Sequence, residues 1–157
     1  MLQALRSTSV ILSAAFLLAT SLCFAAPDLV AAQSKGGASI EGSWHLSISF
    51  DGRSDVEQQL GTFTADGAYI QSSGPGASSG HGAWRQVGPD NYWLTFEVLG
   101  FDEQAPAPVT IKVWANLTVI GESFRAPFRF SVMLPDGTVV DSGTGTATAR
   151  RIVAEPL

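Results

Sequence analysis

The sequence has few cysteines, histidines and charged residues. Its 157 residues include one Cys and two His, and Asp, Glu, Lys and Arg together make up 15% of the chain. One Cys cannot form a disulfide framework or a cysteine-based zinc site. The two histidines, His45 and His81, are far apart in the sequence and lack a paired acidic residue at ligand spacing. We therefore expect no metal site.

Motifs for cofactors and for polyanion binding are missing as well. The sequence has no Gly-x-Ser-x-Gly motif, no phosphate-binding loop and no dinucleotide fingerprint, so we expect no cofactor. The 9 Lys and Arg are outnumbered by 14 Asp and Glu, which gives a net charge of -5. Nucleic acids and anionic membrane surfaces are bound through basic patches, so neither is an expected partner.

Residues 1–32 have the features of a secretory signal peptide. Arg6 precedes a long apolar run without charge, and small residues that suit cleavage end at Ala25 and, better, at Ala32. We predict cleavage after Ala32, which removes Cys23 and yields a secreted or periplasmic protein without stable membrane insertion. The alternative is a retained membrane anchor, because the apolar run is near the short end of what spans a bilayer.

The rest of the chain divides into a short flexible segment, one folded domain and a tail. Residues 33–39 are rich in Ser, Gly and Ala, which predicts a flexible N-terminal segment. Residues 40–152 form the folded domain, and residues 153–157 form a C-terminal tail. The apolar content of 45% is enough to build one core in a domain of this length.

The folded domain has the pattern of strands joined by tight turns. Apolar residues recur at every second position, as in the first stretch, where Trp44, Leu46, Ile48 and Phe50 alternate with polar residues. Asp-Gly and Gly/Pro/Ser clusters separate the stretches and are typical of turns. The expected strands are 44–50, 56–65, 68–73, 81–87, 92–101, 109–119, 124–134 and 138–152.

This succession predicts an all-β fold, an antiparallel up-and-down β-barrel of about eight strands. A sheet of this size has an apolar face, and no helical stretch is available in residues 40–152 to cover it. Closing the sheet into a barrel buries that face and removes the exposed edges. A sandwich of two packed sheets is the main alternative, because the sequence does not distinguish closure from packing.

Both ends of the folded domain carry a family resemblance. Gly42-Ser43-Trp44 stands at the start of the first expected strand, and Arg150-Arg151 stands near the end of the last. With this spacing, residues 40–152 resemble the lipocalin-like barrels of the calycin superfamily, in the form of a small secreted bacterial-type protein. The resemblance implies that Gly42 and Trp44 belong to a barrel closure in which an arginine packs across the indole.

Strand alternation selects between the two arginines. Arg151 falls on the same face as Ala147 and Ala149, whereas Arg150 falls with the outward threonines. We therefore expect Arg151 to be the partner of Trp44.

The leading functional hypothesis is an exported binding protein that holds a small hydrophobic or aromatic molecule in the barrel lumen. A barrel of about eight strands is either filled by its own side chains or holds one small ligand. Gly143 and Gly145 would leave space along the last strand, and a packed core without a cavity is the alternative. The candidate ligand-binding residues are Phe50, Trp84, Phe96, Val113, Leu117, Phe128 and Phe130.

The second hypothesis is an enzyme. Some lipocalin-like barrels are cofactor-free cyclases or isomerases, so the resemblance allows such an activity on a hydrophobic, polyketide-like or lipid-like substrate. The candidate catalytic residues are His81, Glu97 and Tyr92, because a histidine could act as an acid or base and burial would raise the pKa of Glu97. The alternative is that His81 lies on the surface and that Glu97 faces outward near Arg85 or Lys112.

The third hypothesis is an exported domain that binds another macromolecule through its outer face or its loops. Asn116-Leu117-Thr118 is a glycosylation sequon, and strand alternation predicts that Asn116 faces outward. Its use depends on whether the source organism glycosylates secreted proteins.

Overall fold

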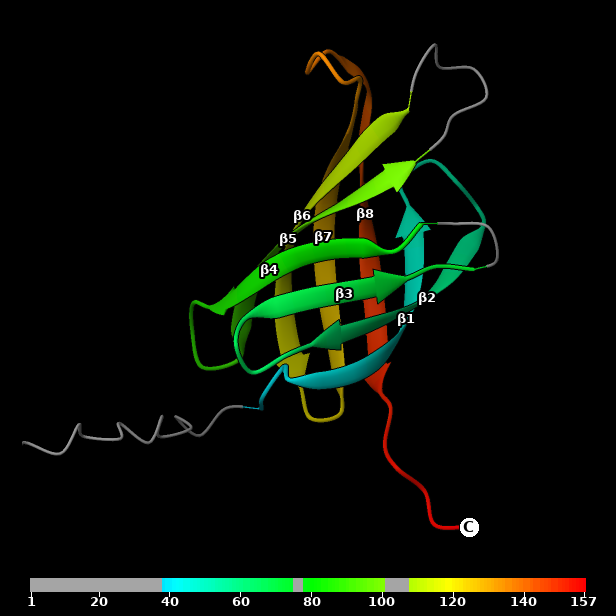
Figure 1. The fold of residues 1–157 in the computed structure, drawn as a ribbon. Coiled ribbons are helices and arrows are strands. Elements are labelled where there is room, and N and C mark those ends of the chain that lie inside the picture. The colour runs from blue at the N-terminus through cyan, green and yellow to red at the C-terminus, as the bar shows by residue number, and fades with distance from the viewer. Residues whose placement is uncertain (1–37, 75–77, 101–107) are drawn as a thin grey trace, which may run out of the picture. The chain divides into compact units, whose positions relative to one another are not determined.

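Eight strands form one closed antiparallel barrel in the computed structural model, which describes residues 38–74, 78–100 and 108–157 (Figure 1). Each strand pairs with the next along the chain, and the last pairs with the first. This confirms the predicted all-β up-and-down barrel and excludes the two-layered sandwich. The strands are β1 (Gly42–Phe50), β2 (Val56–Phe63), β3 (Ala68–Ser72), β4 (Gly80–Gln86), β5 (Asn91–Gly100), β6 (Val109–Ile120), β7 (Ser123–Met133) and β8 (Val139–Arg151).

The predicted signal peptide, residues 1–32, lies outside the described residues, as does most of the predicted flexible segment, residues 33–39. The described part of that segment, Ala38 and Ser39, is hydrogen-bonded to the barrel. The N–H of Ala38 donates to Asp90 at 3.1 Å, and the carbonyl of Ser39 accepts from Arg151 at 2.6 Å. These two residues are therefore part of the folded unit.

Alternation and turn chemistry explain the strands. In β1, the inward residues Trp44, Leu46 and Ile48 are buried, and the polar residues between them face outward. The hairpin between β2 and β3 turns at Asp66-Gly67, where Gly67 has a φ of 90°, a conformation that favours glycine. Because side chains alternate strictly, one strand position on the inner face fixes the orientation of the whole strand.

The barrel wall is higher on one side. β6, β7 and β8 have 12, 11 and 13 residues, whereas β3 has 5 and β4 has 7. Figure 1 shows the long strands running past the short ones to the β7–β8 hairpin. The first described residues and the C-terminal tail lie at the opposite end of the barrel (Figure 1).

A cluster of large buried side chains extends from the end where the chain enters. The largest fully buried side chains are Trp44, Tyr69, Phe63, Ile40 and Leu117. Aromatic rings meet there at short range: the ring centres of Trp44 and Phe124 are 5.0 Å apart, and those of Phe63 and Tyr69 are 4.6 Å apart. Such edge-to-face and tilted pairs stabilise a core beyond the area that they bury.

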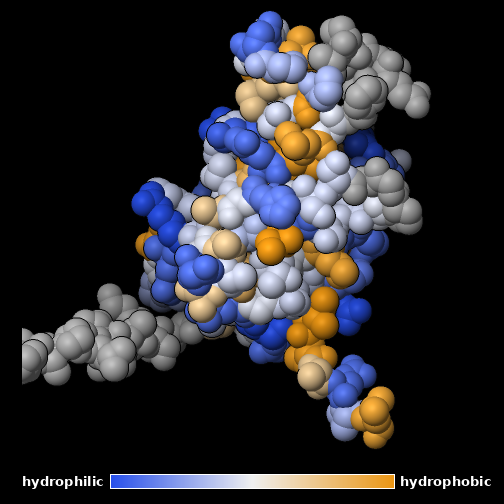
Figure 2. Space-filling view, viewed as in Figure 1, coloured by the Kyte–Doolittle hydropathy of each residue, from blue (hydrophilic) through white to orange (hydrophobic). Residues whose placement is uncertain are grey.

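Several apolar side chains are exposed on the outer surface. Leu60 is 48% exposed and Ile70 is 43% exposed, both from strands whose inner faces carry polar residues. On the face shown in Figure 2, apolar surface is broken into separate areas by polar side chains. In the ranges that the structure describes, no helix is long and apolar enough to cross a membrane.

Candidate functional site

One end of the barrel is sealed by Trp44 and Arg151. The guanidinium carbon of Arg151 lies 4.2 Å from the centre of the Trp44 ring, a cation–π geometry. The same guanidinium donates hydrogen bonds to the backbone carbonyls of Ser39 and Glu41, and its Nε pairs with Glu122 at 2.6 Å. Arg151 therefore ties the entering chain across the base of the barrel.

Gly42 makes room for this arginine. Its φ is 113°, which L-amino acids with a side chain rarely adopt. A Cβ at this position would also lie 3.0 Å from Nη1 of Arg151. The glycine of the Gly-x-Trp pattern thus has a physical reason in this chain.

A second set of contacts completes the seal. The indole N–H of Trp44 donates to the carbonyl of Ile40 at 2.8 Å, and Ile40 is fully buried. The hydroxyl of Tyr92 donates to the carbonyl of Ala38 at 3.0 Å. Burial raises the pKa of Tyr92, so this hydroxyl keeps its proton as a donor. Tyr92, one of the candidate catalytic residues, therefore lies in the closed end.

The other part of the barrel is hollow. A cavity of about 740 Å³ runs inside it and reaches the loops at the end opposite Trp44, where Arg53, Ser78 and Asp141 line it. This volume lies within the range of small-molecule pockets, roughly 300–1,000 Å³. The apolar lining is Leu46, Ile48, Phe50, Phe63, Leu94, Phe96, Val98, Leu99, Ile111, Val113, Ala115, Leu117, Phe124, Ala126, Phe128, Phe130, Val132 and Ala147.

Six of the seven candidate ligand-binding residues line this cavity. They are Phe50, Phe96, Val113, Leu117, Phe128 and Phe130. The structure places the seventh, Trp84, elsewhere: its ring packs 5.6 Å from Tyr92 and 6.2 Å from Phe63, and its N–H donates to the carbonyl of Thr64 at 3.1 Å. Trp84 does face inward, but it lies toward the closed end and does not line the cavity.

Three phenylalanines form an aromatic wall in the cavity. The ring of Phe50 meets the rings of Phe128 and Phe130 edge-on, each at 5.6 Å between centres. The two β7 rings cover the glycines of β8. A Cβ on Gly145 would lie 2.5 Å from Phe128, and one on Gly143 would lie 2.7 Å from Phe130. The space expected beside these glycines is thus occupied by the rings.

The structure does not bring His81 and Glu97 to the lumen. They are cross-strand partners on β4 and β5, and both side chains are exposed on the outer face. Glu97 forms an ion pair with Lys112 at 2.9 Å. The reason is alternation, because the neighbouring positions Gly82 and Phe96 face inward. Asn116 is also exposed, in register with the outward Trp93.

Polar groups that the sequence analysis missed line one side of the cavity. On β2 and β3 the inward positions hold Glu57, Gln59 and Gln71. Gln71 is 2% exposed and is the only buried polar or charged side chain in the described ranges. Its Nε2 donates to Oε1 of Gln59 at 2.7 Å and to Oγ of Ser73 at 2.6 Å. Its Oε1 is buried and has no hydrogen-bond partner among the described residues.

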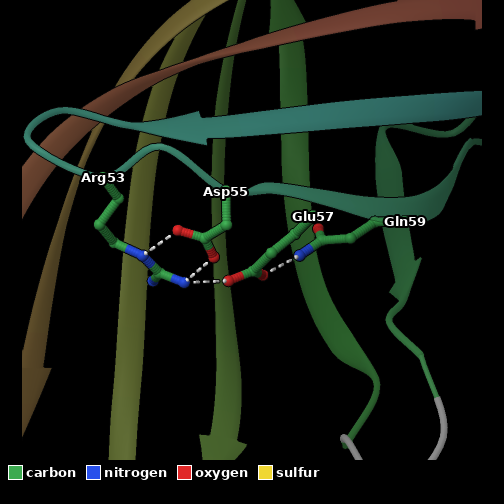
Figure 3. Close-up of polar contacts among 4 residues, drawn as sticks. All are labelled: Arg53, Asp55, Glu57 and Gln59. Carbon is green, nitrogen blue, oxygen red and sulfur yellow. Dashed lines mark hydrogen bonds and ion pairs between the residues drawn. The ribbon is translucent and has the colours of Figure 1, made fainter.

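These groups continue to the mouth of the cavity as one hydrogen-bonded line. Figure 3 shows Arg53 joined to both Asp55 and Glu57, and Glu57 joined to Gln59. Nε of Arg53 donates to Asp55 at 3.0 Å, Nη2 of Arg53 donates to Glu57 at 3.2 Å, and Nε2 of Gln59 lies 3.5 Å from Glu57. The hydrogen bond from Arg53 lowers the pKa of Asp55. Arg53 also lies over Phe50, 4.7 Å from its ring centre.

A signal for these residues was present in the sequence. Phe63 and Tyr69 are large aromatic residues on the two sides of one tight turn, where they are cross-strand partners. If both are set inward, alternation places Gln59, Glu57 and Gln71 inward as well. The apolar residues Val56, Leu60 and Ile70 obscure this pattern because they face outward.

No protein-family model, no curated protein and no solved structure matches the chain significantly. Within residues 38–74, 78–100 and 108–157, no group of three or more His, Cys, Asp or Glu is placed to hold a metal ion.

Proposed function

We propose that this protein is an exported binding protein that holds one small hydrophobic or aromatic molecule in the barrel lumen. The observation that carries the proposal is the cavity of about 740 Å³, lined mainly by aliphatic and phenylalanine side chains. Burial of apolar surface contributes about 25 cal/mol per Å², so a guest that buries about 300 Å² gains roughly 7 kcal/mol. Lost translational and rotational freedom offsets part of this gain.

The closed barrel also favours binding because it holds the lining in place. Every strand is paired on both sides, so the inner side chains are fixed by a continuous backbone ladder. A preformed pocket loses less entropy when it takes a ligand than a flexible one does. Because Trp44 and Arg151 seal one end, a guest would enter from the opposite end, which the cavity reaches.

Binding is favoured over catalysis by the positions of the candidate catalytic residues. His81 and Glu97 face outward, and the hydroxyl of Tyr92 is occupied by a backbone carbonyl in the closed end. Export is supported by the sequence of residues 1–32, where an uncharged apolar run follows Arg6 and ends in small residues.

The test is native mass spectrometry of the full chain expressed in a secreting host, followed by a binding titration. We expect a mass that begins at Gln33 and either a copurified small molecule or an empty protein that binds the neutral fluorescent probe N-phenyl-1-naphthylamine at one site. The same protein unfolded in urea is the control. Absence of both a copurified molecule and saturable probe binding to the folded protein would refute the binding function.

A further inference from the structure

The hydrogen bonds that link Glu57, Gln59 and Gln71 run from donor to acceptor in one direction. This direction is set by Glu57, near the mouth of the cavity. An ionised carboxylate can only accept hydrogen bonds. The carboxylate of Glu57 accepts from Arg53 at 3.2 Å, and its other oxygen faces Nε2 of Gln59 at 3.5 Å. Gln59 must therefore turn its NH₂ group toward Glu57 and its carbonyl oxygen toward Gln71.

The same logic fixes the orientation of Gln71. Because the carbonyl oxygen of Gln59 is an acceptor, Gln71 presents its NH₂ group there, at 2.7 Å. The second N–H of that group donates to Ser73 at 2.6 Å. Both donors of Gln71 are used, and its Oε1 is the group left over. A glutamine oxygen has two lone pairs and needs at least one donor when buried.

On the side of Gly80, the side chains near this oxygen are apolar. A Cβ on Gly80, the cross-strand neighbour of Gln71, would lie 2.5 Å from Oε1 and 3.0 Å from Phe96 and Val98. Glycine at position 80 thus leaves space for the amide. A buried acceptor without a donor costs about 1–3 kcal/mol, and a bound molecule with a suitable donor would remove that cost. The side chain lines the cavity, so a guest in the lumen would lie beside this amide.

The charges at the mouth oppose an anionic guest. Arg53, Glu57 and Asp141 line the cavity, and Asp55 is paired with Arg53, so three carboxylates stand against one guanidinium. Arg53 is held by Asp55 and Glu57, whereas Asp141 has no ion pair among the described residues. A carboxylate that entered would lose hydration without gaining a free cation.

From this arrangement we infer that the lumen selects an uncharged or positively charged molecule with an O–H or N–H donor on an apolar, ring-sized body, and that Oε1 of Gln71 accepts from that donor. The inference rests on the proposed binding function and narrows it. It separates donor-bearing molecules, such as hydrophobic alcohols and amines, from simple hydrocarbons and from carboxylates such as fatty acids.

The experiment compares three probes with one ring system, measured by displacement of N-phenyl-1-naphthylamine. They are 2-naphthylmethanol, the nearly isosteric 2-ethylnaphthalene and 2-naphthoate. In Gln71→Leu we expect the affinity ratio of the alcohol to the ethyl compound to fall about five- to tenfold, the size of one neutral hydrogen bond. We expect 2-naphthoate to bind weakest to the wild type and to gain affinity in the double variant Glu57→Gln, Asp141→Asn.

Ser73→Ala is the matched control, because it removes a neighbouring hydroxyl and leaves Oε1 in place. Its alcohol-to-ethyl ratio should stay within about twofold of the wild type. Undiminished binding of 2-ethylnaphthalene to Gln71→Leu shows that this variant is folded. If every probe binds but Gln71→Leu leaves the ratio unchanged, or 2-naphthoate binds best, the inference is overturned and the binding function stands. If no probe binds the wild type, the binding function itself fails.

Discussion

Trp44 and Arg151 are backbone partners across the β1–β8 seam, and the Arg151 guanidinium carbon lies 4.2 Å from the centre of the Trp44 ring. One pair therefore joins the first strand to the last both through the sheet and through the side chains. The seam is the contact with the greatest sequence separation in the barrel, so it closes at a high cost in chain entropy. Groups that stabilise it should weigh heavily in the stability of the fold.

We predict that Arg151→Ala lowers the free energy of unfolding by about 2–4 kcal/mol, measured by urea denaturation. The substitution removes the contact with Trp44 and leaves the carbonyls of Ser39 and Glu41 without their charged donor. Arg150→Ala is the control, because Arg150 is exposed and faces outward, and its loss should stay within about 0.5 kcal/mol. Equal losses in the two variants would show that the seal does not stabilise the barrel.

The fold was predictable because the sequence repeats one simple pattern. Alternation with period two, Asp-Gly turns and the lack of a covering helix specify strands that must close on themselves. Each expected strand overlaps its observed counterpart, with ends that differ by at most two residues, such as 44–50 against Gly42–Phe50. Expected and observed strands differ at their ends because a residue beside a turn can be assigned either to the strand or to the turn.

The polar side of the lumen was less predictable, because on β2 and β3 the more hydrophobic residues face outward and the polar ones face inward. Leu60 and Ile70 face solvent while Gln59 and Gln71 face the cavity. In the sequence, only the aromatic residues Phe63 and Tyr69 indicate which face of β2 and β3 points into the barrel. Trp84 illustrates a second limit: alternation gives the face of a strand but not the depth along the barrel at which a side chain lies.

Two glycines of β8 should respond differently to the same substitution. A methyl group on Gly145 would clash with the backbone oxygen of Ser49, which the sheet holds in place, and with Phe128. A methyl group on Gly143 would meet only the ring of Phe130, which can rotate toward the hollow lumen. We expect Gly145→Ala to lower the free energy of unfolding by about 1–3 kcal/mol, and Gly143→Ala to lower it by less. Urea denaturation of both variants measures the difference, and the opposite order would contradict this account.

The two tyrosines predict how stability depends on alkaline pH. Burial raises the pKa of both Tyr69 and Tyr92, so the folded protein holds these protons more tightly than the unfolded chain. Their stabilising contribution is complete below about pH 10, the unfolded pKa, and is lost as the pH rises toward the folded pKa values. The urea concentration at the unfolding midpoint should therefore decrease as the pH rises above about 10. This decrease should be smaller in Tyr69→Phe.

Absorbance at 295 nm measures this ionisation directly, because the chain has 2 Tyr. Tyrosinate should appear near pH 10 in urea and only at higher pH in the folded protein, together with loss of circular dichroism. An ordinary midpoint near pH 10 in protein that is still folded would disprove the link between burial and ionisation.

Val113→Trp distinguishes a hollow lumen from a packed one. Val113 lines the cavity on β6, in register with Phe96 on one side and Phe130 on the other. In a packed core the larger ring would lower the free energy of unfolding by about 1–3 kcal/mol, whereas a ring that fills an existing cavity leaves stability unchanged or raises it by about 0.5–2 kcal/mol. We expect the second result, together with at least about tenfold weaker binding of N-phenyl-1-naphthylamine, because the indole takes the place of the guest.

Asn116→Trp adds the same ring to the exposed face of the same strand and should leave probe binding unchanged. A destabilised Val113→Trp barrel with unchanged probe binding would mean that the guest binds outside the lumen.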